Sequence, residues 1–189
     1  MDSPEEVVGL YEGKVLRMVR RGRWEYVERK KNIKAAFICA LTDERKLLVV
    51  KEFRIPLNRW VVGFPAGLIG DTEGLEDEAV EEAVKRELIE EAGYEAKKVT
   101  VWTEGPTSAG LTSEVISLVF AEGLKKVGTG GGLPSENIQN FEIPLRNITR
   151  WLAKAEAEDC IVDPKIYACL YFLGKRKINR SSDLRSEPS

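Results

Sequence analysis

Histidine is absent from this chain of 189 residues, and its absence excludes several kinds of chemistry. Without an imidazole, the chain can build neither a Ser-His-Asp or Cys-His nucleophile nor a zinc site with histidine ligands. Any catalysis must therefore use carboxylates, Lys, Tyr, Ser or a metal ion held by oxygen atoms.

Cysteine is also scarce: the chain contains Cys39, Cys160 and Cys169, with no Cys-x-x-Cys pair among them. An odd number of cysteines argues against a disulfide framework. We expect three reduced residues in or near the core of a cytoplasmic protein.

Long apolar runs and a strong net charge are lacking too. No stretch approaches the ~18 apolar residues that a membrane helix needs. The beginning, "MDSPEEVVGL", has no basic segment followed by an apolar run, so we expect no signal peptide. With a formal net charge of -2, the chain gives no general reason to expect a nucleic acid or an anionic membrane as partner.

The order of the strand and helix patterns predicts an α/β fold, in which helices cover both faces of a mixed sheet. Residues 7–30 alternate apolar and polar side chains, which predicts a small region of two or three antiparallel strands. The apolar runs "IKAAFICAL" and "KLLVVKEFR", joined by "TDER", predict a buried hairpin. Further strand patterns lie at 59–70, 97–105, 114–123 and 141–145, and helical patterns at 76–92, 146–158 and 163–177.

The first helical pattern, "EDEAVEEAVKRELIEEAGY", carries eight acidic residues and two basic ones over positions 76–94. Its apolar stripe comprises Val80, Ala83, Val84 and Leu88, and Gly93 is a natural C-terminal cap. Glu87, Glu90 and Glu91 fall on one face near the end of this helix, because residues three and four apart are neighbours.

That position is unfavourable for unpaired anions, because the C-terminal end of a helix carries a partial negative charge. One interpretation is a solvated acidic face. The other is a hard divalent cation such as Mg²⁺, which prefers oxygen ligands and would make the crowding favourable.

The spacing favours the cation. "RELIEEAGY" matches Arg-Glu-apolar-x-Glu-Glu-x-Gly-apolar at every position, and Glu78 precedes Arg86 with seven residues between them. This pattern resembles the Nudix box of hydrolases that act on a nucleoside diphosphate linked to another moiety. The resemblance implies an α/β/α sandwich with a mixed sheet and a cluster of Mg²⁺ ions, for which Mn²⁺ is a possible substitute.

The resemblance also implies roles for single residues. The metal ligands would be Glu87, Glu90 and Glu91, together with the backbone carbonyl of Ala66. Arg86 would orient these carboxylates as part of the catalytic machinery, and Glu78 would support the junction between loop and helix.

One departure lies just before the helix. The family has a glycine before its first glutamate with five residues between them, and Thr72 stands at that position in this chain. Gly67 is the candidate for the structural glycine, with ten residues between it and Glu78. We interpret "GDTEG" as about five extra residues in the loop.

Other segments resemble the branch that hydrolyses ADP-ribose and nucleoside diphosphate sugars. "VVKEFRIPLNRWVVGFPAGLI" resembles that branch's approach to the box, which implies that Arg54 contacts the diphosphate or the terminal ribose. "RWEYVERKK" resembles a strand in which Trp24 stacks on adenine, Glu25 binds the base and Arg29 lies near phosphate or base. The alternatives are an ordinary surface arginine at position 54 and a tryptophan at position 24 that packs between strands.

Two glutamates are candidates for the general base. Glu114 in "SAGLTSE" takes the place of a glutamate of this branch, although Ala109 replaces the proline that often marks it. Glu136 in "GGLPSEN" resembles the glutamate of a later loop. A carboxylate on a mobile loop can approach a water once substrate is bound. The two residues remain alternatives, and either is otherwise a surface glutamate.

The resemblance implies a Mg²⁺-dependent enzyme that hydrolyses ADP-ribose or a related nucleoside diphosphate sugar. Alternatives are GDP-mannose, a dinucleoside polyphosphate or a 5′-capped RNA as substrate, and a non-catalytic domain that senses nucleotides. The resemblance further implies a homodimer that forms through the N-terminal strands. We expect residues 1–34 to serve dimerisation and base binding, 35–180 to form the hydrolase domain, and 181–189 to be a flexible tail.

Overall fold

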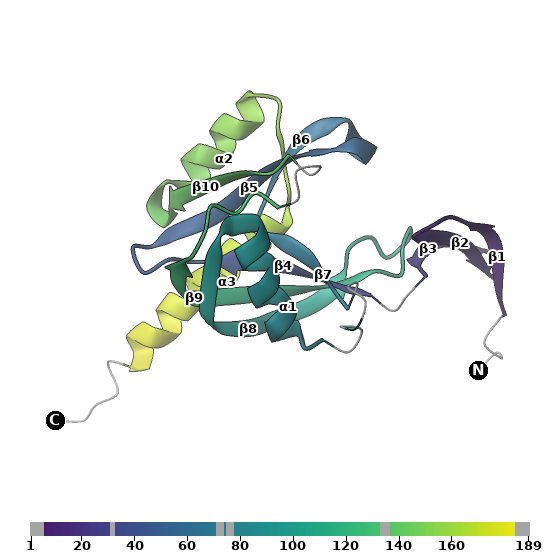
Figure 1. Ribbon diagram of the computed structural model, residues 1–189, viewed down its shortest axis with the longest axis horizontal. Coiled ribbons are helices and arrows are strands. Elements are labelled where there is room, and N and C mark those ends of the chain that lie inside the picture. Colours follow the sequence, from purple (N-terminus) through teal and green to yellow (C-terminus); the bar gives the residue numbers. More distant parts are fainter. Residues whose placement is uncertain (1–5, 31–32, 71–73, 75–77, 133–136, 184–189) are drawn as a thin grey trace.

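The computed structural model describes residues 6–30, 33–70, 74, 78–132 and 137–183, with side chains as far as Arg176. It shows a compact body with a small N-terminal sheet projecting from one side (Figure 1). The strands are β1 Val7–Glu12, β2 Leu16–Arg21, β3 Trp24–Arg29, β4 Lys34–Ala40, β5 Lys46–Arg54, β6 Arg59–Gly63, β7 Ala66–Ile69, β8 Tyr94–Pro106, β9 Val115–Lys126, β10 Gln139–Pro144 and β11 Ile161–Val162. The helices are α1 Val80–Glu87, α2 Ile148–Ala157 and α3 Lys165–Asp183, and short 3-10 turns lie at Ile55–Leu57 and Leu145–Asn147.

The strands of the body form two mixed sheets in the described part of the chain. One sheet has the order β7-β4-β9-β8 and the other the order β10-β5-β6-β11. The pairs β4–β9 and β6–β11 are parallel, and the other neighbours are antiparallel. The predicted α/β class is confirmed, and the strands divide between two mixed sheets where one was predicted.

The predicted hairpin of residues 33–54 is wrong. β4 pairs with β7 and β9, whereas β5 pairs with β6 and β10, so the two strands belong to different sheets. Near the turn, an isolated bridge joins Leu41 and Leu47, and the N–H of Thr42 donates to the carbonyl of Lys46 at 2.9 Å. Near-continuous apolar strands are buried on both faces and can find partners far away in sequence. A short connecting turn therefore did not determine the pairing.

The body has a helix layer on each side of its sheets, and β4 shows why. Because side chains alternate along a strand, Ala36 and Ile38 pack in one cluster with α1, whereas Phe37 and Cys39 pack in another with α2 and α3. Figure 1 shows α1 and α3 on opposite sides of the strands. The predicted sandwich of helix, sheet and helix is therefore confirmed.

The acidic segment forms α1 and continues as a π-helical turn, Leu88–Ala92. Ala83, Val84 and Leu88 of the predicted stripe are buried. Burying a side chain such as Val84 or Leu88 stabilises the fold by about 1.5–3 kcal/mol. Gly93 ends the turn in the left-handed region at φ 73°, as predicted for the cap. Single π-helical turns are frequent at functional sites.

The N-terminal sheet, β1-β2-β3, is antiparallel and meets the body through β3. The backbone of Val27 donates to the carbonyl of Leu111 at 2.9 Å and accepts from the N–H of Ser113 at 3.2 Å. All of β1 is exposed, including Val8, Leu10 and Tyr11. This sheet thus presents apolar side chains outside the core of the body.

The three cysteines are buried and unpaired, as predicted. Among the described residues, no helix is long and apolar enough to cross a membrane.

Candidate active site

A cleft of about 960 Å³ lies at the junction of the two sheets, α1 and the π-helical turn. It gathers residues that are far apart in sequence, from the N-terminal sheet to the beginning of α3. Of the predicted site residues, it brings together Arg29, Arg54, Ala66, Gly67, Arg86, Glu87, Glu90, Glu91 and Glu114.

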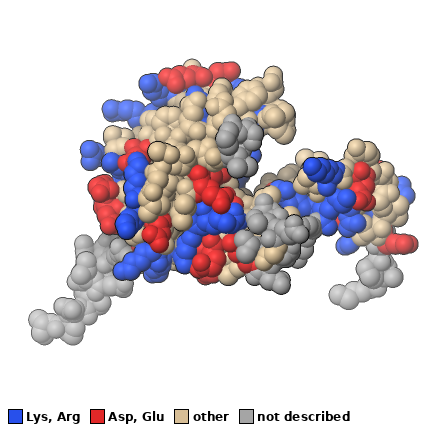
Figure 2. Space-filling view, in the orientation of Figure 1, with Lys and Arg blue, Asp and Glu red and all other residues tan. Residues whose placement is uncertain are grey.

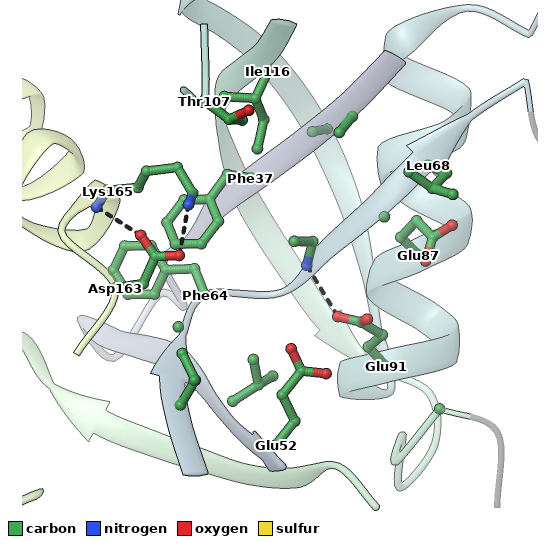
Figure 3. Close-up of a pocket in the computed structure, with 18 of the residues that line it drawn as sticks. Phe37, Glu52, Phe64, Leu68, Glu87, Glu91, Thr107, Ile116, Asp163 and Lys165 are labelled. Carbon is green, nitrogen blue, oxygen red and sulfur yellow. Dashed lines mark hydrogen bonds and ion pairs between the residues drawn. The ribbon is translucent and has the colours of Figure 1, made fainter. Parts of the chain in front are cut away.

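The helix glutamates reach the cleft from one wall. Figure 3 shows the side chains of Glu87 and Glu91 beside the strand that carries Leu68. The carboxylate of Glu91 accepts a hydrogen bond from the backbone N–H of Ala66 at 3.0 Å. The side chain of Glu87 is only 13% exposed, whereas that of Glu90 is 55% exposed. The three glutamates predicted as metal ligands therefore differ in their exposure to solvent and in their contacts with the protein.

Arg86 lies among the acidic side chains of the helix. Its guanidinium donates to Glu78 at 3.2 Å and to Glu87 at 2.8 Å, and also to the carbonyl of Leu68 at 3.3 Å. Glu78 is 8% exposed, so this pair ties the beginning of the helix to the strand beneath it. Burial acts to lower the pKa of Arg86, but the hydrogen bonds and charges of Glu78 and Glu87 raise it above its ordinary value. Arg86 therefore stays charged and holds the carboxylate of Glu87 in place.

Gly67 lies directly against the side chain of Glu87. A methyl group on Gly67 would overlap the carboxyl carbon and an oxygen of Glu87. Any larger residue at position 67 would therefore displace the Glu87 side chain, which gives a physical reason for the glycine ahead of the acidic helix.

Arginines lie elsewhere along the cleft, and each is held by a glutamate. Arg29, at the end of β3, donates to Glu114 at 2.7 and 3.0 Å. The hydroxyl of Thr107 also donates to Glu114, at 3.3 Å. Arg54 forms an ion pair with Glu52. The cleft therefore combines acidic groups, which suit a cation, with arginines, which suit phosphate.

Several cleft residues were missed by sequence reasoning: Phe37, Glu52, Phe64, Asp163 and Lys165. In Figure 3, Lys165 extends over the ring of Phe37, and its ammonium lies 5.0 Å from the ring centre. The carboxylate of Asp163 accepts two hydrogen bonds from Lys165, one from its backbone N–H at 2.9 Å and one from its ammonium group at 2.6 Å. The Asp-Pro-Lys sequence was recognisable as the beginning of a helix. Its place in the cleft depends on the pairing of β11 with β6, which no local pattern indicates.

Other predicted residues lie elsewhere. The side chain of Trp24 is 56% exposed on the projecting sheet, and the exposed Glu25 lies next to it. Neither residue lines the cleft of its own chain. Glu136 and most of the "GDTEG" insertion lie outside the described residues.

The residues fit a divalent metal by the chemistry of their donors rather than by a closed cage. Within the described ranges, no three acidic side chains are already arranged as a metal-binding cluster. Mg²⁺ needs no such cage, because it is commonly bound by one or two carboxylates together with water and substrate phosphates. Glu87 and Glu91 supply hard oxygen ligands on the wall of a cleft that also carries arginines.

Fold and cleft together define an α/β protein suited to a divalent cation and an anionic ligand. The family model described as the NUDIX domain matches residues 31–165, so the chain belongs to this family. The chain is 21% identical to a solved structure titled "Crystal structure of ADP compounds hydrolase", with a TM-score of 0.67 and 95% of both chains covered, which confirms the Nudix fold.

Curated relatives are similar over a shorter part. The ADP-ribose pyrophosphatase of Bacillus subtilis (strain 168) is 35% identical over 126 residues, which cover 66% of this chain and 65% of the relative. The GDP-mannose pyrophosphatase of Cronobacter sakazakii (strain ATCC BAA-894) is 30% identical over 115 residues, or 59% of each protein. The chain thus spans slightly less than two thirds of the length of these relatives.

Proposed function

We propose that this protein hydrolyses the diphosphate bond of ADP-ribose or a related nucleoside diphosphate sugar with the help of Mg²⁺. The observation that carries the proposal is the cleft in which Glu87 and Glu91, held by Arg86 and Ala66, lie together with Arg29 and Arg54. The names of the relatives support both ADP-ribose and GDP-mannose as substrates.

The reaction adds water across the diphosphate. A water oxygen forms a bond to one phosphorus, the bridging P–O bond breaks, and the products are a nucleoside monophosphate and a sugar phosphate. Bound Mg²⁺, held by Glu87, Glu90 and Glu91 and by the carbonyl of Ala66, would supply charge neutralisation and activation of water. Arg54 would bind the diphosphate from the other side, since guanidinium groups match phosphate oxygens.

The contacts of Glu114 bear on the choice of general base. Its carboxylate accepts hydrogen bonds from Arg29 and Thr107. Such a paired anion suits the positioning of Arg29 better than proton abstraction. We therefore favour a role for Glu114 in positioning Arg29. The other candidate for the general base, Glu136, lies outside the described residues.

On the face shown in Figure 2, basic and acidic side chains are interspersed over the body of the molecule. Among the described residues on this face, no continuous basic stripe of the kind that binds nucleic acid crosses the body.

A panel of nucleotide sugars tests the substrate. With Mg²⁺ present, we expect release of AMP from ADP-ribose, and release of GMP from GDP-mannose if the second relative is the better guide. Chromatography of the products is the measurement, with a chelator as the control. Binding of these nucleotides without any released monophosphate would instead support a sensing domain.

We also propose that the active form is a homodimer in which the N-terminal sheet of each chain completes the cleft of the other. Trp24 lies away from its own cleft, and Val8, Leu10 and Tyr11 of the same sheet are exposed. An indole that stacks on a purine contributes ~1–3 kcal/mol in nucleic-acid complexes. A second copy of the chain would cover the apolar side chains and place Trp24 beside a bound base.

Mixed dimers test this arrangement. Trp24→Ala is expected to raise KM about tenfold with little change in kcat, in line with the loss of one stacking contact. If the sites are shared, pairing a Trp24→Ala chain with a Glu91→Gln chain restores one complete site of normal KM. Steady-state kinetics of the tagged and purified mixed dimer is the measurement. The shared site would be contradicted if the mixed dimer kept the raised KM of the Trp24→Ala protein. It would also be contradicted if light scattering showed a fully active monomer.

A further inference from the structure

We propose that Asn140 and the glycine strap, residues 128–132, are a positioning device for the turn that carries Glu90 and Glu91. This inference rests on the metal chemistry of the proposed function, and it concerns residues outside the Nudix box.

The end of a helix leaves its last carbonyl groups without partners inside the helix. Here these groups belong to the same turn as two predicted metal ligands. Gly93 satisfies part of this need, since its N–H donates to the carbonyl of Ile89 at 3.0 Å. The carbonyls of Glu90 and Glu91 need donors from elsewhere in the chain.

The glycine strap supplies these donors. The N–H of Gly132 donates to the carbonyl of Glu90 at 3.0 Å, and the N–H of Gly131 donates to that of Glu91 at 2.7 Å. The side-chain amide of Asn140 donates to the same Glu91 carbonyl at 2.6 Å, and it lies 3.5 Å from the carbonyl of Thr129. Asn140 thus joins the strap to the turn.

The strap can lie this close only because it consists largely of glycine. Gly130, Gly131 and Gly132 have φ values of 62°, 111° and 62°, a region that other residues adopt with strain. A methyl group on Gly130 would overlap the carbonyl oxygen of Glu91 and the backbone of Ala92. The backbone of the strap therefore packs directly on the backbone of the turn.

Asn140 is itself held by its strand. It pairs with Val50 of β5, and Val50 lines the cleft. Two residues further along, Glu142 accepts hydrogen bonds from Lys126 at 2.8 Å and Tyr94 at 2.6 Å. The hydrogen bonds from Lys126 and Tyr94 lower the pKa of Glu142 to about 2, so it stays charged near neutral pH. This network fixes β10 beside the turn.

The arrangement acts on the cation site in two ways. It fixes the backbone from which the Glu90 and Glu91 side chains extend, so less freedom is lost when a cation binds. It also places N–H dipoles at the negative end of the helix, where they offset part of the repulsion among the glutamates.

The test is the affinity for Mn²⁺, measured by electron paramagnetic resonance without substrate. Asn140→Leu keeps the size of the side chain but removes the donor, and we expect about tenfold weaker Mn²⁺ binding, as for other residues that orient metal ligands. At saturating metal, KM for the nucleotide sugar should change less than about threefold, because Asn140 does not line the cleft. Gln139→Leu, at the exposed neighbour on β10, is the control and should leave Mn²⁺ affinity unchanged.

A second pair of variants tests the strap. Gly130→Ala introduces the overlap with Glu91 and should weaken Mn²⁺ binding. Gly22→Ala places the same substitution at a similar φ of 57° in the turn between β2 and β3, away from the strap, so it serves as the matched control. Wild-type Mn²⁺ affinity in both Asn140→Leu and Gly130→Ala would overturn the positioning role. If the wild-type protein binds Mn²⁺ but hydrolyses no nucleotide sugar, the proposed function fails while this inference still stands.

Discussion

Replacing Glu91 by Gln is expected to reduce the rate of diphosphate hydrolysis about 10²–10³-fold, comparable to the loss of one electrostatic group at other active sites. The expected cause is the loss of a negatively charged ligand from the cation site. The fold should be retained, because the amide oxygen of Gln can still accept the hydrogen bond from the N–H of Ala66. The measurement is the rate of hydrolysis over a titration of Mg²⁺, accompanied by a thermal unfolding curve.

The matched control is Glu81→Gln on the same helix, where the side chain is exposed and does not line the cleft. It removes the same charge at a distance from the site, so we expect near-normal activity. Equal rates for Glu91→Gln and Glu81→Gln would contradict the assignment of Glu91 as a metal ligand. Recovery of Glu91→Gln at higher Mg²⁺ concentration would show that affinity for the cation, rather than the chemical step, was lost.

The acidic helix shows how much a periodic pattern can predict. The stripe of Val84 and Leu88, the glycine cap at Gly93 and the shared face of the glutamates follow from residues near one another in sequence. Helix geometry alone turns such spacings into positions in space. The family pattern implied that Arg86 orients the metal-ligand carboxylates, and the structure pairs it with Glu87. Its second pair, with Glu78 eight residues away, was not predicted.

The rest of the site depends on contacts between distant segments. Lys165 lies in the cleft because β11 pairs in parallel with β6. Glu52 lies there because β5 pairs with β6 in a different sheet from β4. Non-local strand pairing is decided by the packing of whole faces rather than by the connecting turn. The same reason explains why the hairpin prediction failed. The donors for the carbonyl of Glu91 come from 40 or more residues further along the chain.

Gly67→Ala is the second substitution with a large expected effect. The added methyl group would overlap the carboxylate of Glu87, so either that side chain or the strand β7 must move. Misplacing one metal ligand should weaken Mn²⁺ binding and lower the rate of hydrolysis about 10²-fold, because small misplacements in active sites have effects of this size. Isothermal titration with Mn²⁺ and steady-state kinetics measure the two effects separately.

Gly63→Ala is a fitting control, because Gly63 lines the same cleft and its added methyl would lie at an ordinary 3.6 Å from the ring of Phe37. We expect less than about a threefold change there, since an added methyl group in ordinary van der Waals contact displaces no neighbour. Shortening the Glu87 side chain gives a sharper test. If the overlap is the cause, Glu87→Asp should harm the Gly67→Ala protein much less than it harms the wild type, as residues in direct contact are not additive. Additive losses in the double variant would show that Gly67 acts on the site through the path of its strand and not through Glu87.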